Sequence, residues 1–178
     1  NIFLQLKENV QSYLYCSTDG GATWTFCVTA ANGGGGGFLK PAFNPTGSGV
    51  TRVSNTGNQY YYSSDFGVTW QVTAASADAP LKGGFVWDAT NNKFLLNNTS
   101  SASGYSSATA NNSAWTAISF TDGTTIANNP PFYVGGKVMA TTTSTSGIAL
   151  SSTNAGSTWS SVTLPAGFTS TAVSVFNN

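Results

Sequence analysis

The sequence contains very little charge. Only 7% of its 178 residues are Asp, Glu, Lys or Arg, whereas charged residues make up about 25% of an average soluble protein. Six basic and six acidic residues give a net charge of zero, so the chain has no long-range field to attract DNA, RNA or anionic lipid. This composition argues against a nucleic-acid partner. It also gives little repulsion between copies, and we expect the surface to pack readily against neighbouring molecules.

Histidine is absent, which removes the commonest general base and both the Ser-His-Asp and the Cys-His nucleophile pairs. The acids share no motif that would supply a carboxylate pair for glycoside hydrolysis. Asp88, which follows Trp87 in a predicted strand, is expected to be a solvated or channel-facing carboxylate. The sequence therefore predicts no enzyme and no cofactor. The acidic residues are Glu8, Asp19, Asp65, Asp78, Asp88 and Asp122.

Metal sites and membrane spans are not predicted either. Two cysteines without histidine cannot form the usual zinc tetrad, and no Asp-x-Asp-x-Asp-Gly calcium loop occurs. No apolar run approaches the roughly 20 residues that a membrane helix needs. No window keeps apolar residues at the helical period of about 3.6 residues. We therefore expect no metal, no membrane insertion and no helical fold.

One eight-residue sequence motif occurs several times in the chain. It first appears at residues 17–24 (STDGGATW), returns at 63–70 and 152–159, and ends in a degraded form at Trp115. The tryptophans Trp24, Trp70, Trp115 and Trp159 are 46, 45 and 44 residues apart, and a fixed period in this range indicates a repeat architecture. The repeated positions are Ser17, Asp19, Gly21, Thr23 and Trp24, then Ser63, Asp65, Gly67, Thr69 and Trp70, then Ser152, Asn154, Gly156, Thr158 and Trp159.

Each copy has the chemistry of a self-capped β-turn. The Ser and Asp side-chain oxygens can accept hydrogen bonds from backbone N–H groups that follow, and Gly21 or Gly67 supplies the positive φ of a tight turn. The Thr-Trp pair then begins a strand and gives it a large apolar ring to bury. We therefore interpret the repeated residues, including the four tryptophans, as structural.

The motif resembles the Asp-box, or BNR repeat, Ser-x-Asp-x-Gly-x-Thr-Trp. In families such as sialidases and sortilin-like receptors, this box lies between the third and fourth strands of a β-propeller blade. The copies at Trp24 and Trp70 match every motif position, and the copy at Trp159 has Asn154 in place of Asp. The resemblance implies an all-β propeller. It does not imply sialidase activity, because sialidases bind the substrate carboxylate with three arginines and this chain has one, Arg52.

Strand patterns predict four blades in a single domain, residues 1–178. The first repeat has room for only two strands before Trp24, at 2–7 and 12–16, and a surplus strand at 170–176 follows the fourth repeat. We predict that this C-terminal strand pairs with the N-terminal strand and closes a four-bladed ring. The other repeats supply four short segments each, rich in β-branched and aromatic residues. They are 38–43, 50–54, 59–63 and 69–73, then 84–89, 93–97, 104–107 and 114–119, then 132–135, 137–142, 147–151 and 158–163.

Cys16 and Cys27 flank the first turn, one on each arm of the predicted hairpin. Neighbouring strands can bring two cysteines within disulfide reach when their geometry allows it. Two alternatives stay open at this point, a disulfide or two buried thiols.

Three functional hypotheses follow. The first is a non-enzymatic structural or adhesive module outside the cell, such as a virion surface or tail protein or an extracellular filament subunit, whose partners are copies of itself or other structural proteins. The low charge and the missing catalytic set favour it. The second is a lectin-like propeller in which Tyr61 and Trp87 stack on surface glycans. The third is a glycan-cleaving enzyme, or a fragment of one, that depends on Asp88 or Glu8.

Overall fold

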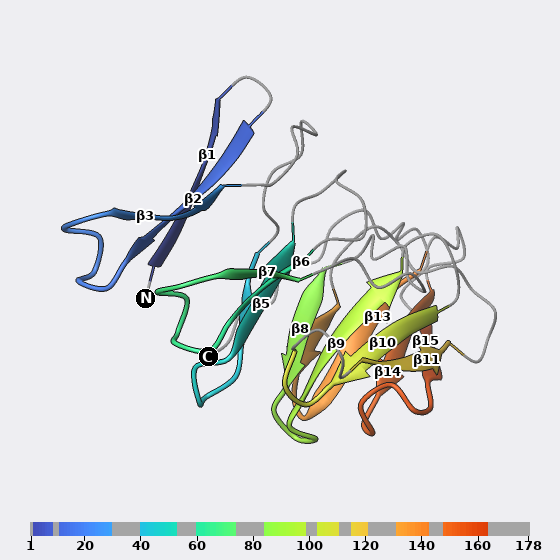
Figure 1. Ribbon diagram of the computed structural model, residues 1–178. Helices are drawn as coiled ribbons and strands as arrows, with labels where there is room; N and C mark the ends of the chain where they lie inside the picture. Colours follow the sequence, from blue (N-terminus) through green and yellow to red (C-terminus); the bar gives the residue numbers. More distant parts are fainter. Residues whose placement is uncertain are drawn as a thin grey trace. The chain divides into compact units, whose positions relative to one another are not determined.

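The computed structural model describes residues 2–8, 11–29, 40–52, 60–73, 84–98, 103–110, 115–120, 131–142 and 148–163 (Figure 1). Every regular element among these residues is a β-strand, and within each sheet consecutive strands pair antiparallel. The strands form four separate sheets, one for each repeat.

The sheets follow one another along the chain, and their strands are as follows. The first sheet consists of β1 (Ile2–Glu8), β2 (Gln11–Ser17) and β3 (Thr25–Thr29). The second consists of β4 (Ala42–Phe43), β5 (Gly49–Arg52), β6 (Tyr60–Ser63) and β7 (Gln71–Thr73). The third consists of β8 (Phe85–Asp88), β9 (Lys93–Asn98), β10 (Ser103–Ser107) and β11 (Thr116–Ser119). The fourth consists of β12 (Phe132–Val134), β13 (Lys137–Thr141), β14 (Ile148–Ser152) and β15 (Ser160–Thr163).

The predicted all-β fold with four blade-like sheets is confirmed. In the first, second and fourth sheets the box turn connects the last two strands, as the sequence predicts. The described residues supply four strands to each of the second, third and fourth sheets, but only three to the first. The predicted C-terminal strand at 170–176 lies outside the described residues, so the closure of the ring stays a prediction.

The chain divides into two compact units. The first comprises Asn1–Ala79 with Ala110–Asn112, and contains β1 to β7. The second comprises Pro80–Thr109 with Ser113–Asn178, and contains β8 to β15. The single domain that the sequence predicts stays a prediction.

The core of the first unit lies between its two sheets. Leu14 of β2 and Tyr61 of β6 are buried against each other, with Phe3, Val28 and Trp70 packed around them. The ring centroids of Phe3 and Trp70 are 6.1 Å apart, and the rings meet edge to face, an arrangement that aromatic pairs prefer. The first and second sheets therefore form one packed layer pair.

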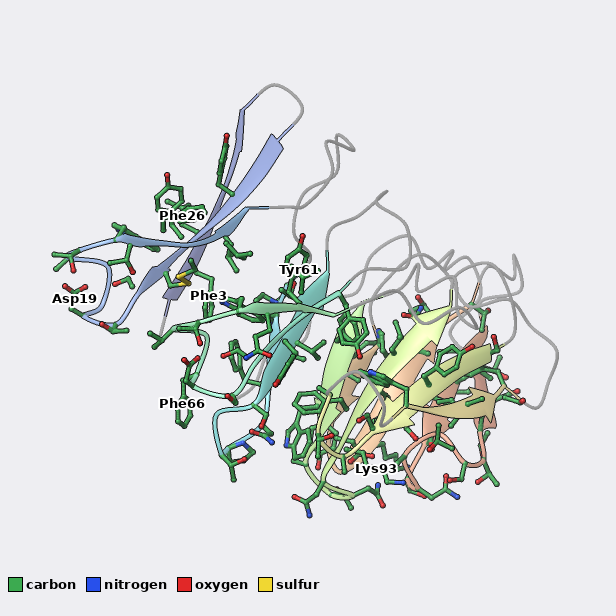
Figure 2. All side chains as sticks on the ribbon, viewed as in Figure 1. Phe3, Asp19, Phe26, Tyr61, Phe66 and Lys93 are labelled. Carbon is green, nitrogen blue, oxygen red and sulfur yellow. A yellow bond between two sulfur atoms is a disulfide. The ribbon has the colours of Figure 1, made fainter. Side chains whose placement is uncertain are left out.

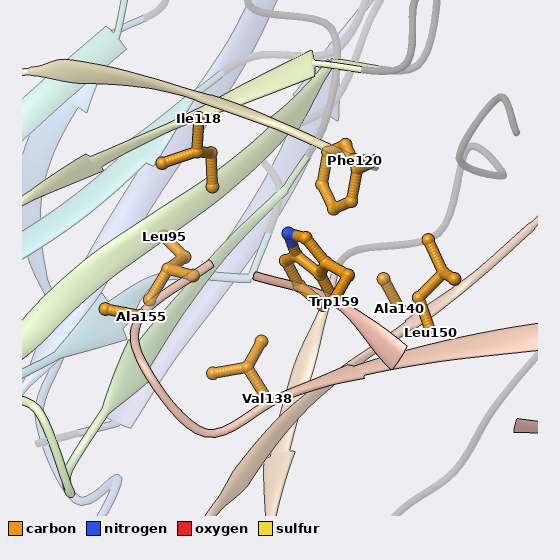
Figure 3. Packing of buried hydrophobic residues seen from close by; sticks show 8 residues of the cluster. All are labelled: Leu95, Ile118, Phe120, Val138, Ala140, Leu150, Ala155 and Trp159. Carbon is orange, nitrogen blue, oxygen red and sulfur yellow. The ribbon is translucent and has the colours of Figure 1, made fainter. Parts of the chain in front are cut away.

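The core of the second unit also lies between two sheets (Figure 3). Trp159 packs in the middle of the cluster, with its ring centroid 4.6 Å from that of Phe120. Each large apolar side chain that becomes buried in this way contributes about 1.5–3 kcal/mol to folding. The buried members are Leu95, Ile118, Phe120, Val138, Ala140, Leu150, Ala155 and Trp159.

Each sheet has two faces because successive side chains on a strand point to opposite sides. We call the face that carries the box tryptophan the tryptophan face, and the opposite one the back face. In the first unit the tryptophan face of the second sheet, with Tyr61 and Trp70, packs on the back face of the first sheet, with Phe3 and Leu14. The second unit repeats this arrangement between the fourth and third sheets.

Candidate functional site

The first Asp-box turn is held by its own side chains. The Gly21 N–H donates to Ser17 Oγ at 2.8 Å, and the Thr23 N–H donates to Asp19 Oδ1 at 2.9 Å. The hydroxyls of Ser17 and Thr23 also donate to the Asp19 carboxylate, at 2.8 and 2.6 Å. Both carboxylate oxygens therefore accept hydrogen bonds from the turn itself.

The second box repeats this network almost atom for atom. Ser63 Oγ accepts from the Gly67 N–H at 2.8 Å, and Asp65 accepts from the Thr69 N–H and hydroxyl at 2.9 and 2.6 Å. The Trp70 indole N–H donates to the Gly67 carbonyl at 3.0 Å, which fixes the ring relative to the turn.

The fourth-repeat box keeps the same turn with an amide in place of the carboxylate. Asn154 Oδ1 accepts from the Thr158 N–H at 2.9 Å, as the Asp oxygens do in the other boxes. The Asn154 amide nitrogen then donates to Thr158 Oγ1 at 2.8 Å, so this one hydrogen bond runs in the opposite direction. Gly156 N–H still donates to Ser152 Oγ at 2.9 Å. The turn therefore needs the side-chain oxygen but not the charge.

The degraded third copy preserves only part of the pattern among the described residues. The Thr109 N–H donates to Ser107 Oγ at 3.3 Å, as the equivalent amide does at Ser63. Residues 111–114, which lead to Trp115, lie outside the described part of the chain.

Hydrogen bonding lowers the pKa of both box carboxylates. At Asp19 the Thr23 hydroxyl has the largest effect, followed by the Thr23 N–H and the Ser17 hydroxyl, and the pKa lies well below its ordinary range. At Asp65 burial acts to raise the pKa, but hydrogen bonds from Thr69 and Ser63 outweigh it and lower the pKa. Hydrogen bonds that favour the ionised form make these groups poor proton donors or acceptors at neutral pH.

Two consecutive residues of each well-formed box have positive φ, whereas the sequence predicts a positive φ only at the motif glycine. Gly20, Phe66 and Ala155 occupy the position before that glycine with φ of 76°, 59° and 53°. A left-handed conformation is uncommon for a residue with a side chain and costs about 1–2 kcal/mol. Phe66 is thus a bulky, exposed side chain on a left-handed backbone (Figure 2).

The motif glycine also lies at the contact between sheets. A Cβ on Gly67 would meet the Phe3 ring at 2.6 Å, and one on Gly156 would meet Ile118 Cδ1 at 2.5 Å. Real Cβ atoms do not approach neighbours this closely. The sequence predicts this glycine for the turn alone, and the structure adds close packing against the preceding sheet as a second reason for it.

Asp88 is a buried turn residue, and the prediction of a solvated or channel-facing carboxylate is wrong. The side chain is 1% exposed. Its oxygens accept from the Thr90 N–H at 3.0 Å, the Asn91 N–H at 3.2 Å and the Asn91 amide nitrogen at 2.8 Å. These hydrogen bonds cap the hairpin between β8 and β9. They engage the Asp88 carboxylate, which the hypothesis of a glycan-cleaving enzyme requires as a catalytic group. Asp78 and Asp122 lie outside the described residues, and Glu8 is described only by its place on β1.

The proposed glycan-stacking pair is not an open site in the structure. Tyr61 is 1% exposed and forms the centre of the first unit's core with Leu14. Its ring therefore cannot stack on a sugar, and that prediction is wrong because β6 turns this residue toward the first sheet. Trp87 is half-buried, with the Phe94 ring 4.7 Å from its own.

The four box tryptophans differ in burial, although the sequence predicts that each buries its ring. Trp159 is 9% exposed, whereas Trp24 is 38% exposed. Trp70 and Trp115 are half-buried. The expectation is therefore wrong for Trp24, whereas Trp159 is covered by the back face of the third sheet.

Cys16 and Cys27 form a disulfide, which decides between the two alternatives that the sequence left open. Their Cα atoms are 6.0 Å apart. Cys27 lies at a register shift, since Tyr15 pairs with Phe26 while Leu14 pairs with Val28. This bulge lets β3 supply one extra residue beside β2.

Among the residues that the structure describes, no three His, Cys, Asp or Glu side chains group closely enough to hold a metal ion. The same residues include no helix with the length and hydropathy of a membrane span.

Comparisons with known proteins agree with this architecture. A family model described as BNR/Asp-box repeat matches residues 15–26 and 61–72, the first two boxes with their flanking strands. Curated protein sequences give no significant match. Among solved structures, the chain resembles the β-propeller in "YCF48 bound to D1 peptide", with a TM-score of 0.55 and 15% identity. YCF48 from Cyanidioschyzon merolae gives a TM-score of 0.49, also at 15% identity.

These matches cover most of this chain but about half of the others. The first covers 86% of this chain and 50% of that chain, and the second covers 88% and 53%. The chain therefore spans about half the length of the YCF48 structures. The repeats and the fold together define the chain as an Asp-box β-propeller.

Proposed function

We propose that this chain is a non-enzymatic structural or adhesive module that acts through protein–protein packing outside the cell, as a virion surface or tail protein or an extracellular filament subunit does. The observation that carries the proposal is the exposed apolar surface of the first sheet. Leu4 is 41% exposed, Trp24 38% and Phe26 55%. Exposed apolar side chains that lie together on one sheet are typical of protein interaction surfaces.

The use of the acidic residues supports a non-enzymatic role. Asp19 and Asp65 accept hydrogen bonds on both carboxylate oxygens from their own boxes. Asp88 does the same within its hairpin. A general acid or base needs a free hydrogen-bonding position toward substrate, and these three carboxylates are engaged in turn formation.

The structural neighbour supports a protein partner. YCF48, a β-propeller of similar fold, has been solved bound to a D1 peptide. A propeller of this kind thus has surfaces that accept polypeptide. We infer that the present chain also binds protein, with a partner of its own.

The disulfide supports an extracellular location. Disulfides persist in oxidising compartments and are rare in reducing ones. Cys16 and Cys27 are joined in the structure. The scarcity of charge agrees with a molecule that packs in an assembly rather than one that remains dispersed.

The proposal is tested on native material by electron microscopy with an antibody against the chain. We expect the label along a regular particle or filament. The competing enzymatic hypothesis is tested in parallel by offering oligosaccharides to the wild-type chain and to a Glu8→Gln, Asp78→Asn, Asp122→Asn variant. Hydrolysis by the wild type that disappears in the variant would overturn the proposal.

A further inference from the structure

The hairpin between β8 and β9 links the third sheet to the fourth sheet inside the second unit. A side-chain amide carries two N–H donors on one nitrogen, and Asn91 uses both. Its Nδ2 donates to Asp88 Oδ2 at 2.8 Å within the hairpin and to the Thr153 carbonyl oxygen at 2.9 Å. Thr153 lies in the fourth-repeat box. One amide group therefore connects the hairpin to the box turn of the neighbouring sheet.

Thr90 makes a second link between the same two sheets. Its hydroxyl oxygen lies 2.7 Å from the Tyr133 hydroxyl and 3.4 Å from the Gly136 carbonyl oxygen. A carbonyl can only accept, so the single hydroxyl hydrogen of Thr90 goes to Gly136 and Tyr133 donates in the shorter hydrogen bond. A Cβ on Gly136 would lie 3.8 Å from Thr90 Oγ1. The β8–β9 and β12–β13 hairpins thus approach each other closely.

The buried Asp88 carboxylate holds Asn91 in the orientation that reaches the fourth sheet. Its Oδ1 accepts from the backbone N–H groups of Thr90 and Asn91, while its Oδ2 accepts from the Asn91 amide. The first oxygen therefore caps the hairpin, and the second orients the side chain that bonds to Thr153. A carboxylate that is 1% exposed needs such hydrogen bonds to offset the cost of its burial.

The apolar packing between these two sheets does not by itself determine the angle at which they meet. Hydrophobic attraction has no preferred direction, whereas hydrogen bonds weaken steeply when their angle changes. Val86 and Tyr133 pack at the border of the cluster around Trp159. Tyr133 also bonds to Thr90, so the directional contacts lie where the apolar cluster ends.

We propose that Thr90 and Asn91 form a latch that fixes the fourth sheet to the third, with Asp88 as the residue that positions Asn91. The latch is a conformational device separate from the proposed packing function, and it depends only on contacts inside the second unit. With the latch open, the Trp159 cluster still joins the two sheets, but the sheets can rotate and water reaches the border of the cluster. With the latch closed, the two sheets are one rigid pair.

The first test compares two neighbouring side chains of the wild-type chain by NMR. Asn91 has both amide hydrogens bonded, while Asn92 is an exposed residue of the same turn. We expect the side-chain amide protons of Asn91 to exchange with solvent about tenfold more slowly than those of Asn92, which corresponds to about 1.4 kcal/mol. Equal exchange rates would overturn the inference.

Three variants separate the latch from the hairpin that carries it. Asn91→Ala keeps the backbone N–H groups that bond to Asp88 Oδ1 but removes the link to Thr153. Asp88→Asn keeps one acceptor oxygen for those N–H groups but turns an amide nitrogen toward Asn91, which loses its partner. Asn92→Gly is the matched control, because it removes an exposed amide from the same turn and glycine readily adopts the φ of 52° found there.

Fluorine NMR of chains labelled with fluorotryptophan reports on the packing between the sheets. The Trp159 resonance is identified by its absence from a Trp159→Phe variant. We expect Asn91→Ala and Asp88→Asn to shift this resonance and to increase its broadening by a dissolved paramagnetic agent. The Trp24 resonance and the β-sheet content are expected to stay as in the wild type, and Asn92→Gly is expected to change nothing. An unchanged Trp159 resonance in both latch variants, or the same change in the control, would overturn the inference.

A double-mutant cycle tests the second link without altering the hairpin cap. Thr90→Val and Tyr133→Phe each remove one hydroxyl and nearly keep the shape of the side chain. Residues in direct contact have coupled effects on stability, whereas independent residues have additive effects. We expect the double variant to lose less stability in urea than the sum of the two single variants. Additive losses would show that the two hydroxyls do not act together, and the latch would then be wrong.

Discussion

Trp24 and Trp159 occupy the same position in two copies of one motif, yet only Trp159 is part of a core. Both follow a Ser-x-Asp/Asn-x-Gly-x-Thr turn with the same hydrogen bonds to the motif serine. Trp159 is 9% exposed and packs on Phe120, whereas Trp24 is 38% exposed. The motif places the tryptophan at the start of the last strand of its sheet. The neighbouring sheet determines whether the indole ring is buried and so contributes to stability.

The two sheets that carry these tryptophans also differ in how they are reinforced. The described residues give the first sheet three strands and the fourth sheet four. The first sheet has the Cys16–Cys27 disulfide, whereas the fourth has Ser151 and Val162 at the corresponding distances from its tryptophan. A covalent link therefore occurs in the sheet with three described strands and the more exposed box tryptophan.

The largest expected effect separates the two tryptophans directly. Trp159→Ala removes a ring packed among Phe120, Ile118 and Leu95 and leaves a cavity, at an expected cost of about 3–5 kcal/mol in the free energy of unfolding. Trp24→Ala removes an exposed ring, at an expected cost of under about 1 kcal/mol. Urea denaturation at a concentration where the chain is monomeric measures both. Equal losses would show that Trp24 is covered within a single chain.

The disulfide is expected to have the next largest effect. Its removal in a Cys16→Ala, Cys27→Ala variant frees a loop with a sequence separation of 11, which in the chain-entropy model costs about 2–3 kcal/mol. The loss is expected in the unfolding of the first unit, which contains both cysteines. Reduction of the wild type should reproduce it, and reductant should not change the double variant. A loss in the second unit instead would contradict the assignment.

A pair of glycines separates turn conformation from sheet packing. Gly20 and Gly67 have similar φ, 76° and 81°, but a Cβ on Gly20 meets nothing within 4 Å while one on Gly67 meets the Phe3 ring. Both Gly→Ala changes are expected to incur the left-handed penalty of about 1–2 kcal/mol. Gly67→Ala should cost about 1–3 kcal/mol more, because the Phe3 ring must move. Thermal or urea unfolding of the two variants gives this difference, and equal costs would mean that the sheets separate easily.

The local chemistry of the boxes could be predicted from the sequence because it is complete within eight residues. Ser63, Asp65 and Gly67 supply the acceptors and the positive φ of their own turn, so no other part of the chain is needed to infer it. The four sheets follow for the same reason, since each turn joins two adjacent strands. The role of Asp88 could also have been found, because Asn91 follows at the spacing of a side-chain-capped turn.

The burial of particular aromatic residues could not be predicted in the same way. Strand alternation indicates that Tyr61 shares a face with its i±2 neighbours, but it does not indicate which sheet covers that face. Tyr61 is buried because Leu14, from a sheet far earlier in the sequence, packs against it. Trp24, at the same position of its own box as Trp70, is 38% exposed. Contacts between sheets depend on the order in which faces stack, and a single repeat does not contain that information.

The smallest expected effect compares the charged boxes with the Asn154 box at low pH. Hydrogen bonds lower the pKa of Asp19 and Asp65 below its ordinary value of 3.8. A carboxyl whose pKa is lower in the folded chain stabilises the fold above the unfolded value, and this contribution is lost as pH falls through the folded pKa. We therefore expect the free energy of unfolding of the wild type to decrease below about pH 4 more steeply than that of an Asp19→Asn, Asp65→Asn variant.

The fourth-repeat box provides the converse change. Asn154 keeps the turn with an amide, so the double variant should fold at neutral pH with slightly lower stability, and Asn154→Asp should add acid sensitivity of the same sign. Urea denaturation between neutral pH and about pH 2 measures all three chains, and the exposed Asp19 and half-buried Asp65 carboxylates, both screened by solvent, should produce a small difference. Parallel pH profiles would mean that the hydroxyls of Thr23 and Thr69 do not favour the ionised carboxylate. In that case the Asp-box would stabilise its turn through hydrogen-bond geometry alone, and the carboxylate charge would not contribute to the free energy of unfolding.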